Sequence, residues 1–228
     1  MPNNSKKLER NRLKKQSTDP VVLDEAVELL LNFEGAKFDE TVELAVKLGI
    51  DPKNSQQAVR GAVSLPHGIG KKVRVIAFAD GDAAKQAEAA GAIEVGAEDL
   101  AKKIVDGWMD FDVAIAHPSM MRHVGKLGRI LGPHGKMPAP KSGTVTDEVG
   151  RAVEEFVAGK VEFRSDGGGN VHAPVGKKSF KKEQLVANVE AFLEHLQSVK
   201  PASAKGIYIQ RAAIAATMSP GVSLVVSG

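Results

Sequence analysis

The side chains best suited to acid–base or metal chemistry in this sequence are its six histidines and a carboxylate pair, Asp110 and Asp112. No histidine lies in H-E-x-x-H or another recognised metal-binding spacing. The two aspartates come at the start of an apolar run, where capping a loop is their expected role. The chain has no cysteine and no G-x-S-x-G segment, so thiolate ligands and recognisable nucleophiles are absent. We predict no catalytic residue, no metal and no cofactor.

Glycine-rich segments of the middle third do not match nucleotide-binding motifs. The turn after VRVIAFA reads ADGDAAK instead of G-x-G-x-x-G, and the spacing of a P-loop is missing. A parallel sheet there is therefore expected to be a scaffold. An enzyme or small-ligand binder with its site in a cleft between two domains remains an alternative, because catalytic groups can converge from distant positions.

Residues 113–146 contain no Asp or Glu and are rich in basic side chains. Glycine and proline around Lys136 allow backbone N–H groups to approach a sugar-phosphate chain closely. The stretch indicates polyanion binding, with a flexible surface loop as the alternative. Its basic residues are Arg122, His123, Lys126, Arg129, His134, Lys136 and Lys141.

Charge is distributed unevenly although the net charge is only +3. Residues 1–20 and 160–228 each carry +4, whereas residues 21–67 carry −4. This asymmetry favours local polyanion contacts over a uniformly basic body. Aromatic residues make up 4% of the chain, which argues against rows of stacking platforms for bases. No apolar run could span a bilayer and the N-terminus lacks a signal peptide, so the cytoplasm is the expected location and no membrane partner is expected.

The two ends of the chain carry patterns of strands and amphipathic helices. Residues 1–20 are predicted to be a basic tail or a loosely held helix, and LDEAVELLLNF a helix. Alternating apolar residues predict strands in TVELAVKLGI and over 59–65, followed by a linker in PHGIGKK. Near the C-terminus, VEFRSDGGGNVHAPVG predicts two strands around a Gly-rich turn, KEQLVANVEAFLEHLQSV a long helix, and GIYIQRAAIAATM and VSLVV closing strands.

Strands and helices alternate in the middle of the chain. VRVIAFA, AIEVG and FDVAIAHP are predicted strands, and GDAAKQAEAAG, AEDLAKKIVDG, SMMRHVGKLGRILGP and DEVGRAVEEFVAG are predicted helices, with an irregular loop in GPHGKMPAPKSGT. Such alternation indicates parallel βαβ units. We predict an α/β protein in which residues 1–67 and 160–228 form one α+β domain. A Rossmann-like parallel α/β domain, residues 68–159, is inserted into it.

Several segments, in order along residues 20–225, together resemble one family. The segment KLGRILGPHGKMPAPKSGTV has a K-L-G-x-x-L-G-P-x-G core and an M-P-x-P-K ending. The other segments are AKFDETVELAVKLGID, RGAVSLPHGIGK, GWMDFDVAIAHP, NVHAPVGKKSF and TMSPG. Together they resemble the bacterial large-subunit ribosomal protein L-one family.

The resemblance implies a function that composition does not show. Members of the family bind a junction in large-subunit ribosomal RNA, chiefly through the domain formed by both termini. They form the mobile stalk of the large ribosomal subunit, assist release of deacylated tRNA from the exit site, and repress translation of their own operon's messenger RNA. The resemblance also implies a monomer outside the ribosome. A general RNA chaperone without specificity is a further alternative.

The family's RNA-binding positions carry over to this sequence. In the terminal domain they are Lys37, Phe38, Thr41, Glu43, Arg164, Asp166, His172, Thr217, Met218, Ser219 and Pro220. Secondary RNA contacts are expected at Arg122, Lys126, Arg129, Lys136 and Lys141.

A physical interpretation agrees with three of the carried-over positions. Phe38 stands between charged neighbours at the edge of a strand, where an exposed ring could pack on a ribose or base, although a core aromatic is the alternative. Thr41 offers a hydroxyl, and Met218 is flexible enough to fill an irregular surface. Recognition would then rest on RNA shape and backbone.

Four positions depart from the family pattern. Ser219 stands where glycine is usual, and Arg211 where a small polar residue is expected. His134 replaces an arginine, and Lys136 replaces an apolar residue. In the loop, the changes at His134 and Lys136 relocate charge. All four changes leave the exact RNA contacts open.

Overall fold

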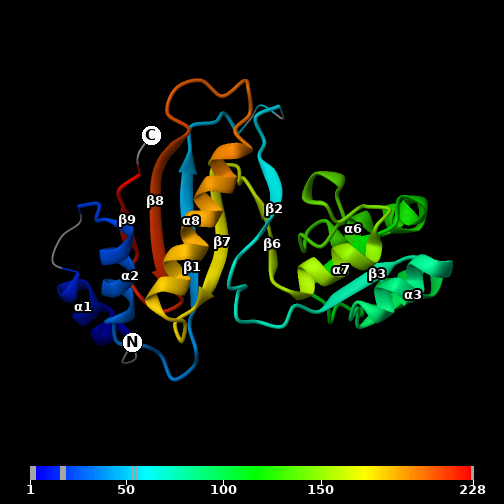
Figure 1. Ribbon diagram of the computed structural model, residues 1–228, viewed down its shortest axis with the longest axis horizontal. Helices are drawn as coiled ribbons and strands as arrows, with labels where there is room; N and C mark the ends of the chain where they lie inside the picture. The colour runs from blue at the N-terminus through cyan, green and yellow to red at the C-terminus, as the bar shows by residue number, and fades with distance from the viewer. Residues whose placement is uncertain (1–3, 16–18, 53, 55, 227–228) are drawn as a thin grey trace. The chain divides into compact units, whose positions relative to one another are not determined.

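The computed structural model describes residues 4–15, 19–52, 54 and 56–226 (Figure 1). Residues 1–3 and 16–18 of the expected basic tail lie outside the described residues. The chain folds into two compact units, one of residues 1–70 with 161–228 and the other of residues 71–160. We call them the terminal unit and the inserted unit. Antiparallel pairing in the first and parallel pairing in the second confirm the α/β fold class.

A four-stranded antiparallel sheet forms the body of the terminal unit, in the order β7-β1-β8-β9. Its strands are β1 (Thr41–Leu48), β7 (Asn170–Lys177), β8 (Ile209–Ala216) and β9 (Val222–Leu224). One face packs on α2 (Leu23–Leu31) and α8 (Lys182–Ser198), which lie on the same side of the sheet in Figure 1. In this way strands from both ends of the chain share one hydrophobic core.

The first helix of the terminal unit is held more firmly than the sequence suggested. Helix α1 spans Asn4–Lys14, and Asn11 is fully buried. Its amide nitrogen donates to the carbonyl oxygen of Glu34 at 3.2 Å, and its amide oxygen accepts from the N–H of Glu34 at 2.9 Å. Of the two expectations for this segment, the helix is confirmed over these residues, and a tertiary amide pair holds it although its apolar content is low.

The two strands expected around the Gly-rich turn belong to different sheets. Strand β6 (Lys160–Arg164) pairs with β2 (Arg60–Ser64) in a two-stranded sheet, and β7 pairs with β1. Among the described residues, a single bridge between Ser165 and Val171 joins the two arms. The segment is therefore not a regular hairpin, because its two arms pair with different strands, β6 with β2 and β7 with β1.

The inserted unit has a parallel sheet in the order β4-β3-β5, covered on both faces. Strands β3 (Val75–Phe78), β4 (Glu94–Gly96) and β5 (Val113–Ala116) alternate with α3 (Gly81–Ala89), α4 (Glu98–Val105) and α7 (Val149–Val157). All four residues of β3 are buried. Helices α3 and α7 approach closely at Gly150, where a Cβ would lie 3.0 Å from that of Gln86.

The helix expected over residues 119–133 is broken into short pieces. The chain forms η1 (Pro118–Met120), α5 (Met121–Val124), η2 (Gly125–Leu127) and α6 (Gly128–Leu131), with η3 (Pro140–Ser142) in the loop beyond. Val124, Leu127 and Leu131 are buried at helical spacing, so the short pieces share one apolar face. Gly125 and Gly128 begin new segments because glycine weakens a continuous helix.

Asp112 anchors the start of the inserted unit. Its carboxylate accepts hydrogen bonds from Lys71 Nζ and from the backbone N–H of Arg74, each at 3.0 Å. Burial alone would raise its pKa, but the hydrogen bonds from Arg74 and Lys71 outweigh burial and lower the pKa to about 2. The expected role of this aspartate as a loop cap is consistent with these contacts.

Candidate nucleic-acid interface

The four-stranded sheet of the terminal unit has a covered face and an open face. The even-numbered residues of β1, 42 to 48, are buried in the core. Side chains of a strand alternate between faces, so Thr41, Glu43, Ala45 and Lys47 point to the opposite side. No helix of the described residues packs on that side in Figure 1, and Glu43 is exposed there. The open face is therefore available to a partner.

A buried carboxylate organises the rim where β1 begins. Glu40 is 1% exposed, and one of its oxygens accepts the backbone N–H of Met218 at 3.0 Å. Its other oxygen accepts the N–H of Ala36. Burial lowers the pKa of the adjacent Lys178 and the charge of Glu40 opposes that shift. Glu40 therefore ties the segment before β1 to the turn after β8.

Thr41 and Thr217 reinforce this connection. The N–H of Thr41 donates to Thr217 Oγ1, and the N–H of Thr217 donates to the carbonyl oxygen of Thr41, both at 3.1 Å. Lys177, opposite Thr41 on β7, donates from Nζ to Thr41 Oγ1 at 2.8 Å. The two expected threonines are thus brought together, and their hydroxyls hold a fixed geometry on an exposed rim.

Ser219 has a local structural role in the turn after β8. Its hydroxyl oxygen accepts the N–H of Ala216 at 2.9 Å, and its own N–H donates to the carbonyl oxygen of Ala216 at 3.0 Å. Ser219 and Pro220 are both half-buried. A serine in place of glycine is therefore accommodated by a closed turn, and Met218 is left as the projecting residue.

Two large apolar side chains stand exposed at the rim. Phe38 is 56% exposed, and Met218 is 37% exposed. Lys37 beside Phe38 is also exposed. Asp39 on the other side accepts hydrogen bonds from the N–H and the hydroxyl of Ser179. Phe38 is therefore not the core aromatic that was the alternative interpretation, and the contacts of Asp39 hold the backbone beside it.

The Gly-rich turn presents its expected residues in different ways. Asp166 accepts the N–H groups of Gly168 and Asn170 at 2.8 and 2.7 Å, and these hydrogen bonds lower its pKa. Its carboxylate therefore shapes the turn. His172 is exposed on the open face, with Nε2 3.9 Å from an oxygen of Asp166. Arg164 is exposed on β6, which belongs to the two-stranded sheet.

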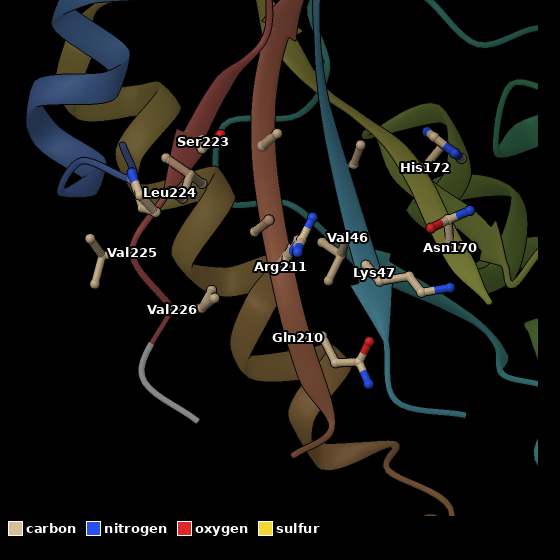
Figure 2. A pocket seen from close by; sticks show the side chains of 14 residues that line it. Val46, Lys47, Asn170, His172, Gln210, Arg211, Ser223, Leu224, Val225 and Val226 are labelled. Atoms are coloured by element: carbon tan, nitrogen blue, oxygen red, sulfur yellow. The ribbon is translucent and has the colours of Figure 1, made fainter. Parts of the chain in front are cut away.

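A hollow of about 730 Å³ lies at the end of the open face away from the Glu40 rim (Figure 2). Ala45 and Ala213 form part of its floor, and Lys47, His172 and Arg211 stand among its lining residues. Figure 2 shows these polar side chains on three neighbouring strands, β1, β7 and β8. The open face therefore has a small-residue floor with basic groups around it.

The basic residues expected to make secondary contacts lie in the inserted unit. Arg122, Lys126, Arg129 and Lys141 are exposed. Lys136 is different, because its ammonium group donates to the carbonyl oxygens of Met109 and Phe111 at 3.0 and 2.6 Å, and it lies 4.8 Å from the Phe111 ring centroid. These contacts give Lys136 a structural role inside the unit and leave it poorly placed for a phosphate.

Sequence reasoning missed three residues of this surface: Glu40, Lys47 and Lys177. Glu40 stands inside the matched F-D-E-T segment, but no local pattern distinguishes a buried carboxylate from an exposed one. Lys177 became relevant only through its register opposite Thr41. The period-2 alternation of β1 is the one signal that could have placed Lys47 on the same face as Glu43.

The described residues contain neither a cluster of metal ligands nor a helix that could span a membrane. Within residues 4–15, 19–52, 54 and 56–226, no group of three or more His, Asp or Glu is arranged to hold a metal ion. Over the same ranges, no helix combines the length and the apolar character that crossing a membrane requires.

Comparison with known proteins places this chain among the ribosomal proteins. The family model described as "Ribosomal protein L1p/L10e family" matches residues 30–220. The large ribosomal subunit protein uL1 of Kosmotoga olearia is 51% identical over 224 residues, which cover 98% of this chain and 97% of that relative. The chain belongs to the ribosomal protein L1p/L10e family. A member of this family is a structural component of the ribosome and not an enzyme, so the enzyme alternative is set aside.

Proposed function

We propose that this chain is a component of the large subunit of the cytoplasmic ribosome and binds a junction in large-subunit ribosomal RNA. The terminal unit is the RNA-binding domain, and the inserted unit supplies secondary contacts. Support comes from the family and from the name of the relative, a protein of the large ribosomal subunit.

The observation that carries the proposal is the hydrogen-bonded rim around Glu40. Met218 and the segment of Phe38 are tied to one buried carboxylate, yet both side chains remain exposed. Holding large apolar groups exposed in a fixed geometry gains nothing for folding, but it lowers the entropy cost of binding. An aromatic ring can stack on a base, and fixed threonine hydroxyls can meet a 2′-OH or a phosphate.

A role as the mobile stalk, with release of deacylated tRNA from the exit site, is part of the same proposal. It would need a second RNA surface apart from the rim. Arg122, Lys126, Arg129 and Lys141 offer one, because exposed lysine and arginine side chains neutralise phosphates irrespective of sequence. Repression of the chain's own messenger RNA would use the rim itself, if that messenger folds into a similar junction.

Co-sedimentation tests the assignment to the large subunit. Tagged chain in a cell lysate should sediment with large ribosomal subunits and with complete ribosomes, and should be rare on small subunits. A variant with Phe38→Ala and Met218→Ala together should shift toward the unbound fractions. Wild-type chain found only in unbound fractions would contradict the proposal, and equal recovery on all RNA would favour a general RNA chaperone.

A further inference from the structure

An irregularity in β8 gathers polar groups at one end of the open face. The register between β1 and β8 shifts between Lys47 and Leu48, and both Gln210 and Arg211 are exposed as a result. Lys47 and Arg211 then stand directly opposite each other on neighbouring strands. Bulges of this kind redirect side chains and are frequent beside functional sites.

The pair formed by Lys47 and Arg211 is a cross-strand pair of like charges. Directly opposite residues on one face have Cβ atoms about 4.5–5.5 Å apart, so two cations there repel each other. Lys47 donates to the carbonyl oxygen of Gly168, and this hydrogen bond offsets part of the repulsion between the two cations. The guanidinium of Arg211 makes no hydrogen bond or ion pair with any residue that the structure describes. The sheet therefore holds a positive charge that nothing in the described fold neutralises.

The surroundings of this pair favour an anion. His172 and Asn170 line the same hollow from β7, and Ser223 from β9 (Figure 2). No acidic side chain lines the hollow among the described residues. The floor at Ala45 and Ala213 is low, so a polymer backbone can lie close to the sheet. A guanidinium also presents a planar fork of donors that matches a phosphate group.

We propose that Arg211, together with Lys47 and His172, forms a phosphate-binding site for the RNA backbone at this end of the open face. The inference rests on the proposed function and extends it, because it carries the RNA across the sheet from the Glu40 rim to the β8 bulge. The site would add affinity and fix the register of the RNA, without reading its bases.

The salt dependence of junction-RNA binding tests this site. Each phosphate contact contributes close to one unit to the slope of log K against log salt concentration. Arg211→Ser should lower that slope by about one and weaken binding at low salt several-fold, with the difference fading as salt rises. Arg211→Lys should keep most of the slope, because it keeps the charge. Arg60→Ala removes an exposed arginine from β2 in the two-stranded sheet, and its slope should match that of wild type.

Three results would overturn the inference. These are a wild-type slope in Arg211→Ser, an equal loss of slope in Arg211→Lys and Arg211→Ser, or a loss of the same size in Arg60→Ala. A Lys47→Gln variant gives a second reading if Arg211→Ser does not fold, and it should also lower the slope. If wild type itself shows no preference for the junction, the proposed function fails independently of Arg211.

A second arm separates RNA phosphate from free phosphate. NMR signals of the Arg211 side chain should shift when junction RNA is added, and should change little with inorganic phosphate at matched ionic strength. Saturation by inorganic phosphate alone would contradict the assignment to the RNA backbone.

Discussion

At the scale of residues, Phe38 and Met218 are the side chains on which the proposed RNA contact most depends. We predict that Phe38→Ala and Met218→Ala each weaken junction binding by about 1–3 kcal/mol, the range for stacking contacts in RNA binders. Val22→Ala is a matched control in the same unit, because Val22 and Phe38 are both 56% exposed. Filter binding measures the effect, and wild-type affinity in both folded variants would remove these residues from the interface.

Glu40 is a residue whose effect on RNA would be indirect. Glu40→Ala leaves the N–H groups of Ala36 and Met218 without their acceptor, at a cost of about 1–3 kcal/mol in the free energy of unfolding. Junction affinity should fall as well, because the turn of Met218 loses its anchor. Glu40→Gln keeps one acceptor oxygen, so its stability and its junction affinity should lie between those of wild type and those of Glu40→Ala. Chemical denaturation and RNA titration measure both effects; a folded Glu40→Ala with unchanged affinity would contradict the positioning role.

Tyr208, the single tyrosine of the chain, makes the stability depend on alkaline pH. Burial raises its pKa to about 12 from an ordinary value of 10.0, and its hydroxyl makes no hydrogen bond within the described residues. A raised folded-state pKa means that this contribution is intact below pH 10 and is lost as pH rises toward 12.

Tyr208→Phe should remove this part of the pH dependence, about 2–3 kcal/mol between neutral pH and pH 12. At neutral pH the variant should be as stable as wild type or slightly more so, because it loses only an unpartnered hydroxyl. Chemical denaturation of wild type and of Tyr208→Phe over a range of pH measures this difference in pH dependence. Parallel curves for both would show that Tyr208 ionises as easily in the folded chain as in the unfolded one.

The sequence predicted part of this surface at the residue scale. Thr41, Thr217 and Met218 came from a family resemblance, and the structure brings Thr41 and Thr217 into direct contact. Lys136 came from local charge, and in the structure its ammonium group donates to the carbonyl oxygens of Met109 and Phe111. Local charge cannot show that an ammonium group has reached two backbone carbonyl oxygens across a fold, since that depends on tertiary contacts.

At the scale of elements, periodicity predicted the helices and strands well where each is regular. The prediction was less accurate where tertiary contacts decide how strands pair and how a helix is held. Strands β6 and β7 look like one hairpin from their turn, but they join separate sheets. Buried Asn11 holds α1 in place, a contact that no helical pattern contains. The segment over 119–133 kept its apolar spacing while its glycines divided it.

The loop after α6 offers a prediction at this scale. Lys136→Met removes the two hydrogen bonds to Met109 and Phe111 and should destabilise the chain by about 1–3 kcal/mol. Its effect on RNA binding should be no larger than that expected from partial unfolding. Lys141→Met, at an exposed position in the same loop, should leave stability unchanged and weaken RNA binding slightly. Denaturation and RNA titration are measured on both variants. Unchanged stability with weaker RNA binding in Lys136→Met would instead support Lys136 as an RNA contact.

At the scale of the whole molecule, both ends of the chain are needed for one surface. The rim combines residues near position 40 with residues near 218, and the open face combines β1, from the first part of the chain, with β7, β8 and β9, from its last part. Net charge gave little indication of this surface, because residues 21–67 are acidic overall. A surface of this kind would recognise the shape of a folded RNA, and electrostatic attraction would contribute only part of its affinity.

Affinity for a junction RNA and for a random duplex of equal length, measured over a range of salt concentrations, is the decisive test of the proposed recognition. Non-specific binding falls steeply as counterions compete, whereas shape-specific contacts retain their preference. We predict that the preference for the junction persists or grows as salt rises. Equal affinities for the two RNAs at every salt concentration would contradict specific recognition by the terminal unit.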